Sequence, residues 1–337
     1  MASIDSVDCI SQVLVTGASG FLGRRLVAAL VGYGYAVRAL TRRESQTEFL
    51  RSLGAEPVIG DVTDLESLRS AFVGVDSVVH AAADTRGSIE SGRQTTIQGT
   101  QNVLDLCTQL KIKKLIYISS CSVYGIADRA VVDRVDENAP LESHPGRRGP
   151  YSWAKFEAEQ LVLEYMQDGH SATVCLRPGT IYGTGGELFT PMIGFGVKNK
   201  LFIVIGNGHF FLPLVYVDNL VDAVLASLLN KASNGQVYNV VDPEKVNKRL
   251  YMQKLISRLY PGSKYVYFPY GLLFIIVLCQ EILFKILRKK PYLTRYRLIS
   301  SQKSVVYDSS KIQEQLGWLP RVAFDEAVAQ IIKFEKV

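Results

Sequence analysis

The sequence predicts an α/β protein built on a doubly wound parallel sheet, with a smaller mixed C-terminal part that binds substrate. Two observations predict it. An apolar run at Val13, Leu14 and Val15 leads through a glycine-rich turn into a segment whose apolar residues recur at helical spacing. Beyond it, apolar strand-like runs keep alternating with helix-like segments, which is typical of a parallel sheet covered on both faces.

The glycine-rich turn, residues 16–23, reads TGASGFLG and carries Gly17, Gly20 and Gly23 between the strand and the helix. A dinucleotide pyrophosphate needs bare backbone N–H groups at a helix N-terminus, and side chains at these glycines would keep the phosphates out. The spacing GxxGxxG differs from the GxGxxG of many dehydrogenases, and glycine-rich turns also occur without a ligand. The strand before and the helix after nevertheless favour a nucleotide site in a Rossmann-type fold.

The second apolar run, residues 36–40, ends in Thr41, Arg42 and Arg43. In a doubly wound fold this strand end lies at the adenosine ribose. There an acidic residue binds the 2′-hydroxyl of NAD, and an arginine accommodates the 2′-phosphate of NADP. Because Thr41 stands in the place of the acid and two arginines follow, the sequence predicts NADP, with NAD as the alternative. In the other interpretation, these arginines only hold a surface loop.

Three more strands are expected at residues 57–61, 77–83 and 115–118, with helices over 64–72 and 96–110. Small residues after the fourth strand, including Ala81 and Ala82, suit a backbone that lies against a flat ligand. His80 in that strand is expected to be a packed histidine rather than a catalyst. An apolar run late in the chain, residues 236–241, is expected to return to the main sheet.

The candidate catalytic residues follow the fifth strand. Residues 119–125 read SSCSVYG, and GPYSWAK at 149–155 places Tyr151 and Lys155 at i and i+4 of a helix that starts at Pro150. A lysine ammonium beside a tyrosine lowers the pKa of the phenol, as an acid–base catalyst near neutral pH requires. With a serine hydroxyl for the substrate oxygen and a nicotinamide, hydride transfer becomes feasible. YxxxK also arises by chance as an exposed pair, so the order of the motifs is what favours catalysis.

Together these motifs resemble the extended short-chain dehydrogenase/reductases, which include nucleotide-sugar epimerases and 3β-hydroxysteroid dehydrogenases. Besides those quoted, the matching segments are GDVTD at 60–64, HAAA at 80–83, LRPGTIYG at 176–183, PLVYVDNLVDA at 213–223 and LGWLP at 316–320. The resemblance covers nearly the whole chain and implies an NAD(P)-dependent oxidoreductase. It implies Tyr151 as the general acid/base and Lys155 as its electrostatic partner and ribose ligand. Ser120 is implied as the catalytic hydroxyl, with Ser122 as the alternative.

The cofactor site expected from the turn and the resemblance comprises Gly17, Ser19, Gly20, Phe21, Leu22, Arg42, Asp61, Val62, Ala81, Ala82, Tyr151, Lys155 and Pro178. Within it, the resemblance places Asp61 and Val62 beside the adenine. No metal site is expected, because the 4 histidines have no neighbour at ligand spacing.

Two branches of the family compete for the substrate. Nucleotide-sugar enzymes usually carry RxxNxYGP after the sixth strand, but here Thr180 replaces the asparagine and Thr184 the proline. They also often have an arginine where this chain has Leu212, and a diphosphate without such partners is poorly compensated. The segments resemble the 3β-hydroxysteroid dehydrogenase and sterol-4-carboxylate dehydrogenase branch, which implies a secondary alcohol or ketone of a lipophilic, steroid-like substrate. The alternatives are a nucleotide-sugar epimerase, dehydratase or 4-keto reductase, and a catalytically silent dinucleotide-binding sensor.

The stretch from Tyr270 to Leu287 reads YGLLFIIVLCQEILFKIL and is predicted to be an apolar helix. At about 1.5 Å per residue it would span roughly 27 Å, close to the thickness of a bilayer core. Glu281, Lys285 and Arg288 fall on one polar stripe, however. This stripe favours a helix that lies in a membrane interface, or that caps an apolar pocket, over one that spans the bilayer. A buried core helix is the third interpretation.

The composition bounds partners and location. The net charge is +6 and the basic doublets are scattered, so no nucleic-acid partner is expected. The 5 cysteines lie far apart, which predicts a reducing compartment, and residues 1–11 lack the apolar core of a signal peptide. We therefore expect a cytoplasmic protein, free or peripheral on a membrane, and the resemblance implies a homodimer by analogy. The expected domains are a cofactor-binding domain over 1–178 and a substrate-binding part over 179–337, with 213–243 returning to the main sheet.

Overall fold

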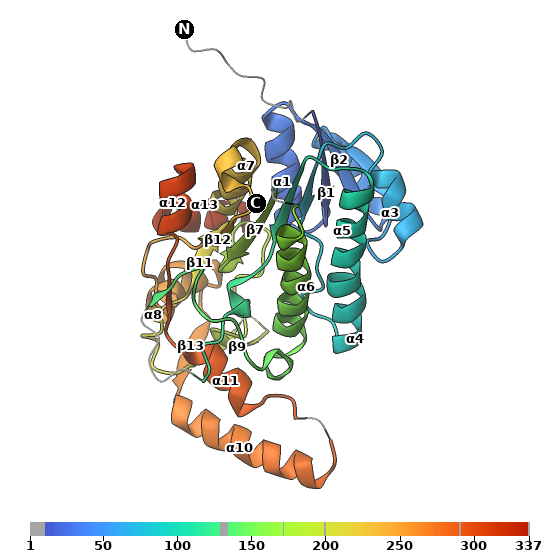
Figure 1. The fold of residues 1–337 in the computed structure, drawn as a ribbon. Coiled ribbons are helices and arrows are strands. Elements are labelled where there is room, and N and C mark those ends of the chain that lie inside the picture. Colours follow the sequence, from blue (N-terminus) through green and yellow to red (C-terminus); the bar gives the residue numbers. More distant parts are fainter. Residues whose placement is uncertain (1–10, 129–133, 171, 199, 290, 336–337) are drawn as a thin grey trace.

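The computed structural model describes residues 11–128, 134–170, 172–198, 200–289 and 291–335 (Figure 1). The signal-peptide prediction and Cys9 concern residues outside this description. The centre is a seven-stranded sheet of order β12-β7-β5-β4-β1-β2-β3, in which every pairing is parallel. Its strands are β1 (Gln12–Thr16), β2 (Ala36–Thr41), β3 (Glu56–Ile59), β4 (Ser77–His80), β5 (Lys114–Ile118), β7 (Thr173–Pro178) and β12 (Val237–Val240). The strand order reverses between β1 and β4, which confirms the predicted doubly wound sheet.

Helices cover both faces of the sheet (Figure 1). On one face lie α1 (Phe21–Gly32) and α7 (Val217–Leu229), and on the other lie α3 (Leu65–Ala71), α5 (Gly99–Gln109) and α6 (Pro150–Gln167). Successive strand residues point to opposite faces, so Val13 and Val15 enter one core cluster and Leu14 the other. The continuous apolar run in β1 therefore serves two cores at once.

The helix starts follow local chemistry. The Asp64 side chain accepts a hydrogen bond from the Glu66 N–H and caps α3, and Pro150 occupies the first turn of α6. The helix expected over 96–110 begins earlier. It starts as α4 (Ile89–Gly92), capped by the Ser88 side chain, and passes through a π-helical stretch, Arg93–Gln98, into α5.

The range 213–243 divides between two sheets. β12 pairs with β7 at the edge of the main sheet, and α7 packs against the same sheet. β11 (Leu214–Tyr216) instead pairs in parallel with β8 (Thr180–Tyr182) in a separate two-stranded sheet. Other small sheets are β13-β10-β9, made of Lys264–Phe268, Leu201–Ile205 and Gly194–Val197, and β14-β6, made of Val306–Tyr307 and Arg134–Val135. The remaining short or peripheral helices are α2 (Thr47–Ser52), α8 (Lys248–Tyr251), α9 (Ser257–Leu259), α12 (Ser310–Leu316) and α13 (Phe324–Glu335).

One helix stands away from the body of the molecule. α10 (Tyr270–Ile286) projects at the bottom of the view, at the end of the molecule far from α1, and α11 (Arg295–Gln302) brings the chain back (Figure 1). Val277 is the only buried residue of α10, so the interpretation as a buried core helix is wrong. Among the residues that the structure describes, no helix combines the length and apolar character needed to cross a bilayer.

Candidate active site

A cavity of about 990 Å³ opens at the carboxyl ends of the main-sheet strands. Its walls come from the segments that follow β1, β2, β3, β4, β5 and β7 and from the smaller C-terminal sheets. Every residue expected to act in catalysis or cofactor binding lines this one cavity. The sequence motifs, which lie far apart in the chain, therefore meet where a doubly wound sheet places its ligand.

The glycine turn has the shape of a phosphate cradle. Gly17 has a φ of +68°, and a Cβ there would lie 2.9 Å from the backbone nitrogen of Ala82. The Gly20 N–H donates to the Gly17 carbonyl at 2.9 Å and closes the turn at the start of α1. No described side chain caps this helix, and its first turn holds no acidic residue, so its first N–H groups have no side-chain partner among the described residues. These features fit the pyrophosphate of a dinucleotide.

The adenosine end lies where β2 and β3 finish. Arg42 Nη1 is 3.7 Å from Oδ2 of Asp61, and both residues line the cavity. Val62 is buried, and its carbonyl accepts a hydrogen bond of 2.8 Å from the Asn102 side chain, which fixes the loop. Arg43 does not line the cavity, so of these two arginines only Arg42 faces the space that a ligand could occupy.

His80 is a packed histidine, as predicted. Its Nδ1 lies 2.7 Å from the Thr16 hydroxyl and its Nε2 lies 3.0 Å from the Thr100 hydroxyl. Burial, followed by the charge of Lys155, lowers the pKa of His80 to about 3, so the ring is neutral at physiological pH. It ties β4 to β1 and to the helix that carries Thr100.

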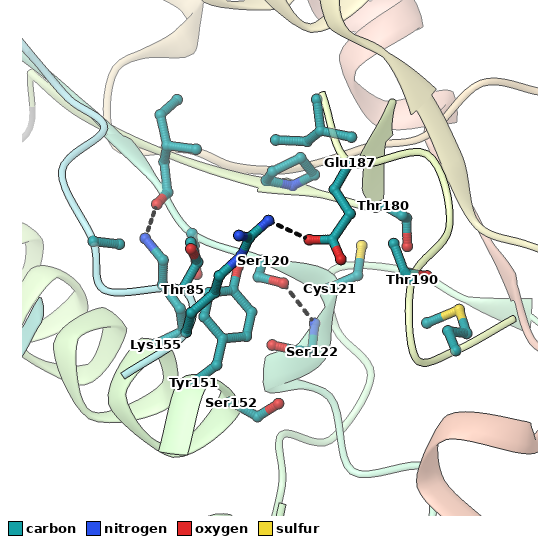
Figure 2. A pocket seen from close by; sticks show the side chains of 18 of the residues that line it. Thr85, Ser120, Cys121, Ser122, Tyr151, Ser152, Lys155, Thr180, Glu187 and Thr190 are labelled. Atoms are coloured by element: carbon teal, nitrogen blue, oxygen red, sulfur yellow. Dashed lines mark hydrogen bonds and ion pairs between the residues drawn. The ribbon is translucent and has the colours of Figure 1, made fainter. Parts of the chain in front are cut away.

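Ser120, Tyr151 and Lys155 gather in one part of the cavity (Figure 2). Ser120 follows β5, and its hydroxyl accepts a hydrogen bond of 3.1 Å from the Ser122 N–H. Burial raises the pKa of the Tyr151 phenol, and a hydrogen bond with the Ser120 side chain acts in the opposite direction. The expected lowering of the Tyr151 pKa by Lys155 is therefore wrong for this structure, because burial outweighs the other influences.

Lys155 belongs to α6, and its side chain is almost completely buried against the end of β5. Its Nζ donates to the Ile118 carbonyl at 2.6 Å and lies 5.0 Å from the centre of the Tyr117 ring. Burial lowers the pKa of Lys155 to about 8. The ammonium is thus held at the base of the cavity by a backbone carbonyl, with donor hydrogens left for a ligand.

A buried polar network supports this part of the site from behind. The Ser119 hydroxyl donates to Glu159, and Glu159 forms an ion pair of 2.6 Å with Arg177. Arg177 also donates to the Tyr124 hydroxyl at 2.8 Å. Both members of the ion pair are 3% exposed or less, so these contacts hold β5, β7 and α6 in a fixed relation. Glu159 is not predictable from the sequence, since a single glutamate in a helix gives no signal.

The side of the cavity away from the glycine turn combines apolar side chains with polar and charged ones. Its apolar lining comes from the smaller sheets and from the segment after α10, and comprises Met192, Phe195, Phe210, Phe211, Leu293 and Leu298. The buried hydroxyls of Ser122 and Thr190 have no hydrogen-bond partner among the described residues. Arg297 also lines the cavity and forms no ion pair with a described residue. Thr190 and Arg297 are not predictable from the sequence, because no motif surrounds them.

Comparison with known proteins identifies the family of this chain. The model of the NAD dependent epimerase/dehydratase family matches residues 13–241. The 4-hydroxy-2-methyl-3-oxo-4-farnesyl-3,4-dihydroquinoline-1-oxide ketoreductase of Stigmatella aurantiaca is 32% identical over 73% of this chain and 72% of its own length. The 3beta-hydroxysteroid-dehydrogenase/decarboxylase isoform 1 of Arabidopsis thaliana is 30% identical over 95% of this chain and 78% of its own. The crystal structure of gox2253 covers 97% of this chain and 98% of its own, with a TM-score of 0.80 and 26% identity.

The chain therefore belongs to the NAD dependent epimerase/dehydratase family. It is an NAD(P)-dependent oxidoreductase of the extended short-chain dehydrogenase/reductase type, and it binds a nicotinamide dinucleotide. This assignment agrees with the resemblance in the sequence motifs and with the phosphate cradle at Gly17. It argues against the alternative of a catalytically silent sensor.

Proposed function

We propose that this enzyme oxidises or reduces a secondary alcohol or ketone of a lipophilic, steroid-like substrate, with NADP as its cofactor and NAD as the alternative. The observation that carries the proposal is that Ser120, Tyr151 and Lys155 line the same cavity as the glycine turn and the apolar side chains of the C-terminal part. A hydride donor, a proton relay and a hydrophobic pocket are then adjacent, as carbonyl reduction requires.

In this proposal Tyr151 exchanges a proton with the substrate oxygen, and Ser120 hydrogen-bonds the same oxygen. The bound nicotinamide supplies or accepts the hydride. Lys155, which already donates to the Ile118 carbonyl, holds the cofactor ribose. The hydrogen bond from the Ser122 N–H keeps the Ser120 hydroxyl in place.

The lipophilic substrate is supported by the cavity wall and by the relatives. Phe195, Phe210 and Leu298 offer aromatic and aliphatic surface of the kind that binds flat hydrocarbon rings. The names of two relatives describe ketones or alcohols on lipophilic skeletons, one farnesylated and one a steroid. Leu212, where nucleotide-sugar enzymes often have an arginine, is buried and does not line the cavity.

Tyr151→Phe tests the reaction. The variant should keep its affinity for NADPH, measured by cofactor fluorescence, and lose at least about a hundredfold in turnover, because the proton relay is gone. The matched control is Tyr292→Phe, which removes a hydroxyl from an exposed tyrosine of the cavity rim and should leave turnover unchanged. Full activity of Tyr151→Phe would exclude this assignment.

A second candidate is a nucleotide-sugar epimerase, dehydratase or 4-keto reductase. One observation favours it: Arg297 lines the cavity and has no acidic partner among the described residues, so it could pair with a diphosphate. Arg297→Gln should then weaken UDP-sugar binding at least about tenfold. If the substrate is lipophilic and uncharged, the same variant should leave its KM nearly unchanged.

A further inference from the structure

The outward face of α10 is a continuous apolar surface. Its exposed side chains are Leu272, Ile275, Ile276, Ile282, Leu283 and Ile286, with exposed fractions from 48% to 73%. They recur at helical spacings of three, four and seven residues and so form one stripe along the helix. We call this stripe the apolar face of α10. Soluble surface helices normally expose polar residues on the corresponding side.

The polar residues in the middle of α10 point toward the protein instead. The Gln280 amide donates to the Leu293 carbonyl at 3.0 Å and accepts from the Tyr292 N–H at 3.2 Å. Glu281 pairs with Arg295 at 2.6 Å. The polar stripe predicted from Glu281 therefore starts on the inner side, where it fastens the loop between α10 and α11. The apolar face is left without a protein partner in the described chain.

Positive charge gathers at the end of the apolar face. The segment 270–298 contains the cations Lys285, Arg288, Lys289, Lys290, Arg295 and Arg297, and Glu281 is its only acid. Glu281 is already engaged by Arg295. Lys285, Arg288 and Lys289 are exposed and form no ion pair with a described residue. Apolar side chains beside unpaired cations match the interface of an anionic bilayer, where acyl chains and lipid phosphates adjoin.

The cavity opens next to this surface. Tyr292, Leu293, Arg297 and Leu298 belong to the segment directly after α10, and all of them line the cavity. Gln280 and Glu281 hold that segment to the helix through the hydrogen bonds and the ion pair described above. The apolar face and the substrate side of the cavity are therefore connected by a short, fixed piece of chain.

We propose that α10 docks on the surface of an anionic membrane, with its apolar face in the headgroup region and its cations on lipid phosphates. A second copy of the chain fits less well, because an α10–α10 contact would desolvate the cations while the only acid of the segment is already paired. The proposed docking requires no bound substrate and does not depend on which substrate the enzyme uses. Its corollary, that a lipophilic substrate reaches the cavity from the bilayer, rests on the proposed function.

A fluorescent label on Cys279 tests the docking directly. Cys279 is exposed on α10, whereas Cys107, Cys121 and Cys175 are buried, so a thiol dye on a Cys9→Ser protein reacts at one place. We expect a blue shift of an environment-sensitive dye with vesicles of equal parts phosphatidylcholine and phosphatidylglycerol. Vesicles of phosphatidylcholine alone should give a weaker shift. An unchanged emission spectrum with both vesicle types would overturn the proposal.

Two pairs of double variants separate the apolar from the electrostatic contribution to vesicle binding. Binding of each is measured by co-sedimentation with the same vesicles. The double variant Ile275→Glu with Ile282→Glu should lower vesicle binding more than about tenfold. Its control is Val73→Glu with Leu319→Glu, which changes two exposed apolar side chains elsewhere and should leave binding unchanged. The double variant Lys285→Gln with Lys289→Gln should weaken binding to the anionic vesicles. Its control is Lys231→Gln with Lys245→Gln, which changes the net charge equally at exposed sites elsewhere and should leave binding unchanged.

The outcomes also separate this proposal from the proposed function. Vesicle binding is read without substrate, so its failure leaves the reaction of Tyr151 untested and overturns only the docking. Lost turnover with intact vesicle binding counts against the reaction alone. A dimer that dissociates on Ile275→Glu with Ile282→Glu, together with no vesicle binding, would assign the apolar face to a second copy and overturn the membrane proposal.

Discussion

Arg86 and Glu187 form an ion pair that joins two walls of the cavity. Nη2 of Arg86 lies 2.7 Å from Oε2 of Glu187, and both residues line the cavity, with Glu187 beside the polar groups that include Ser120 (Figure 2). Arg86 follows β4 of the main sheet, and Glu187 follows β8 of a separate small sheet. The side chains are 78% and 51% exposed, so the pair stabilises the fold very little. The pair therefore acts mainly as a bridge across the gap between the two cavity walls, where a ligand would pass.

Glu187→Gln should therefore change ligand access rather than stability. We expect the free energy of unfolding to shift by less than about 1 kcal/mol, and the association rate of substrate in stopped-flow experiments to rise a few-fold. Glu90→Gln is the matched control, because Glu90 pairs with Arg93 at 3.9 Å, and neither residue lines the cavity. Equal association rates in wild type and Glu187→Gln would show that the pair does not limit access.

Gly17→Ala should weaken cofactor binding. A methyl group at this position meets the Ala82 nitrogen at 2.9 Å, and the φ of +68° is strained for alanine. We expect cofactor affinity to fall at least about tenfold and the free energy of unfolding to fall by about 1–3 kcal/mol. Gly32→Ala at the end of α1 meets nothing within 4 Å and should leave both quantities close to wild type. Calorimetric titration with NADPH makes the comparison, and unchanged affinity in Gly17→Ala would contradict the phosphate cradle.

Variants of Arg42 and Arg43 test the predicted preference for NADP over NAD. Arg42 lines the cavity beside Asp61, and Arg43 does not. Arg42→Ala should raise the Kd for NADPH about tenfold and change the Kd for NADH much less, because only NADPH carries the 2′-phosphate. Arg43→Ala should affect neither constant. If Arg42→Ala weakens both cofactors equally, the preference for NADP has another origin or does not exist.

The buried ion pair behind the catalytic residues should be costly to break. Glu159→Gln leaves the Arg177 guanidinium buried beside a neutral amide, so we expect the free energy of unfolding to fall by about 3–5 kcal/mol. Glu56→Gln removes the partner of Arg38 in a half-exposed pair of 2.8 Å and should cost at most about 1 kcal/mol. Urea unfolding followed by circular dichroism measures both, and equal losses would mean that burial of Glu159 adds nothing.

Lys248 makes stability depend on pH. Its ammonium is fully buried, donates to the Gln302 side chain at 2.6 Å, and burial lowers its pKa to about 7. The unfolded chain keeps this proton up to a pKa of about 10.4, so between these values only the unfolded state binds it, and stability should rise with pH. Lys248→Met should remove this rise, on the order of a few kcal/mol across the interval. Parallel stability curves for wild type and variant would contradict the assignment.

The parts of the fold that the sequence predicted are those encoded locally. The strand, glycine turn and helix around Gly17 need only short-range contacts and the close approach of one neighbouring loop. Tyr151 and Lys155 were predictable because Pro150 fixes the start of their helix and so their common face. The order of the motifs then placed them at one edge of a parallel sheet.

The parts that the sequence did not predict arise from contacts between distant segments. The pairing of β11 with β8 joins two motif segments whose mutual contact neither motif encodes. The ion pair between Arg86 and Glu187 joins two segments without a recognisable motif. The raised pKa of Tyr151 follows from tertiary burial, which helical spacing with Lys155 does not reveal. In α10 the periodicity was visible, but which side faced the protein was decided by the contacts of Gln280 with the following loop.

The most direct test of the proposed function is a fluorescence titration of the purified protein with NADPH and NADH, followed by turnover assays. The panel contains hydroxysteroids, other lipophilic ketones and UDP-sugars. We predict tighter binding of NADPH and turnover confined to the lipophilic compounds, lost in Tyr151→Phe. Turnover of UDP-sugars, with none on the lipophilic compounds, would contradict the account and assign the cavity to the epimerase branch through Arg297.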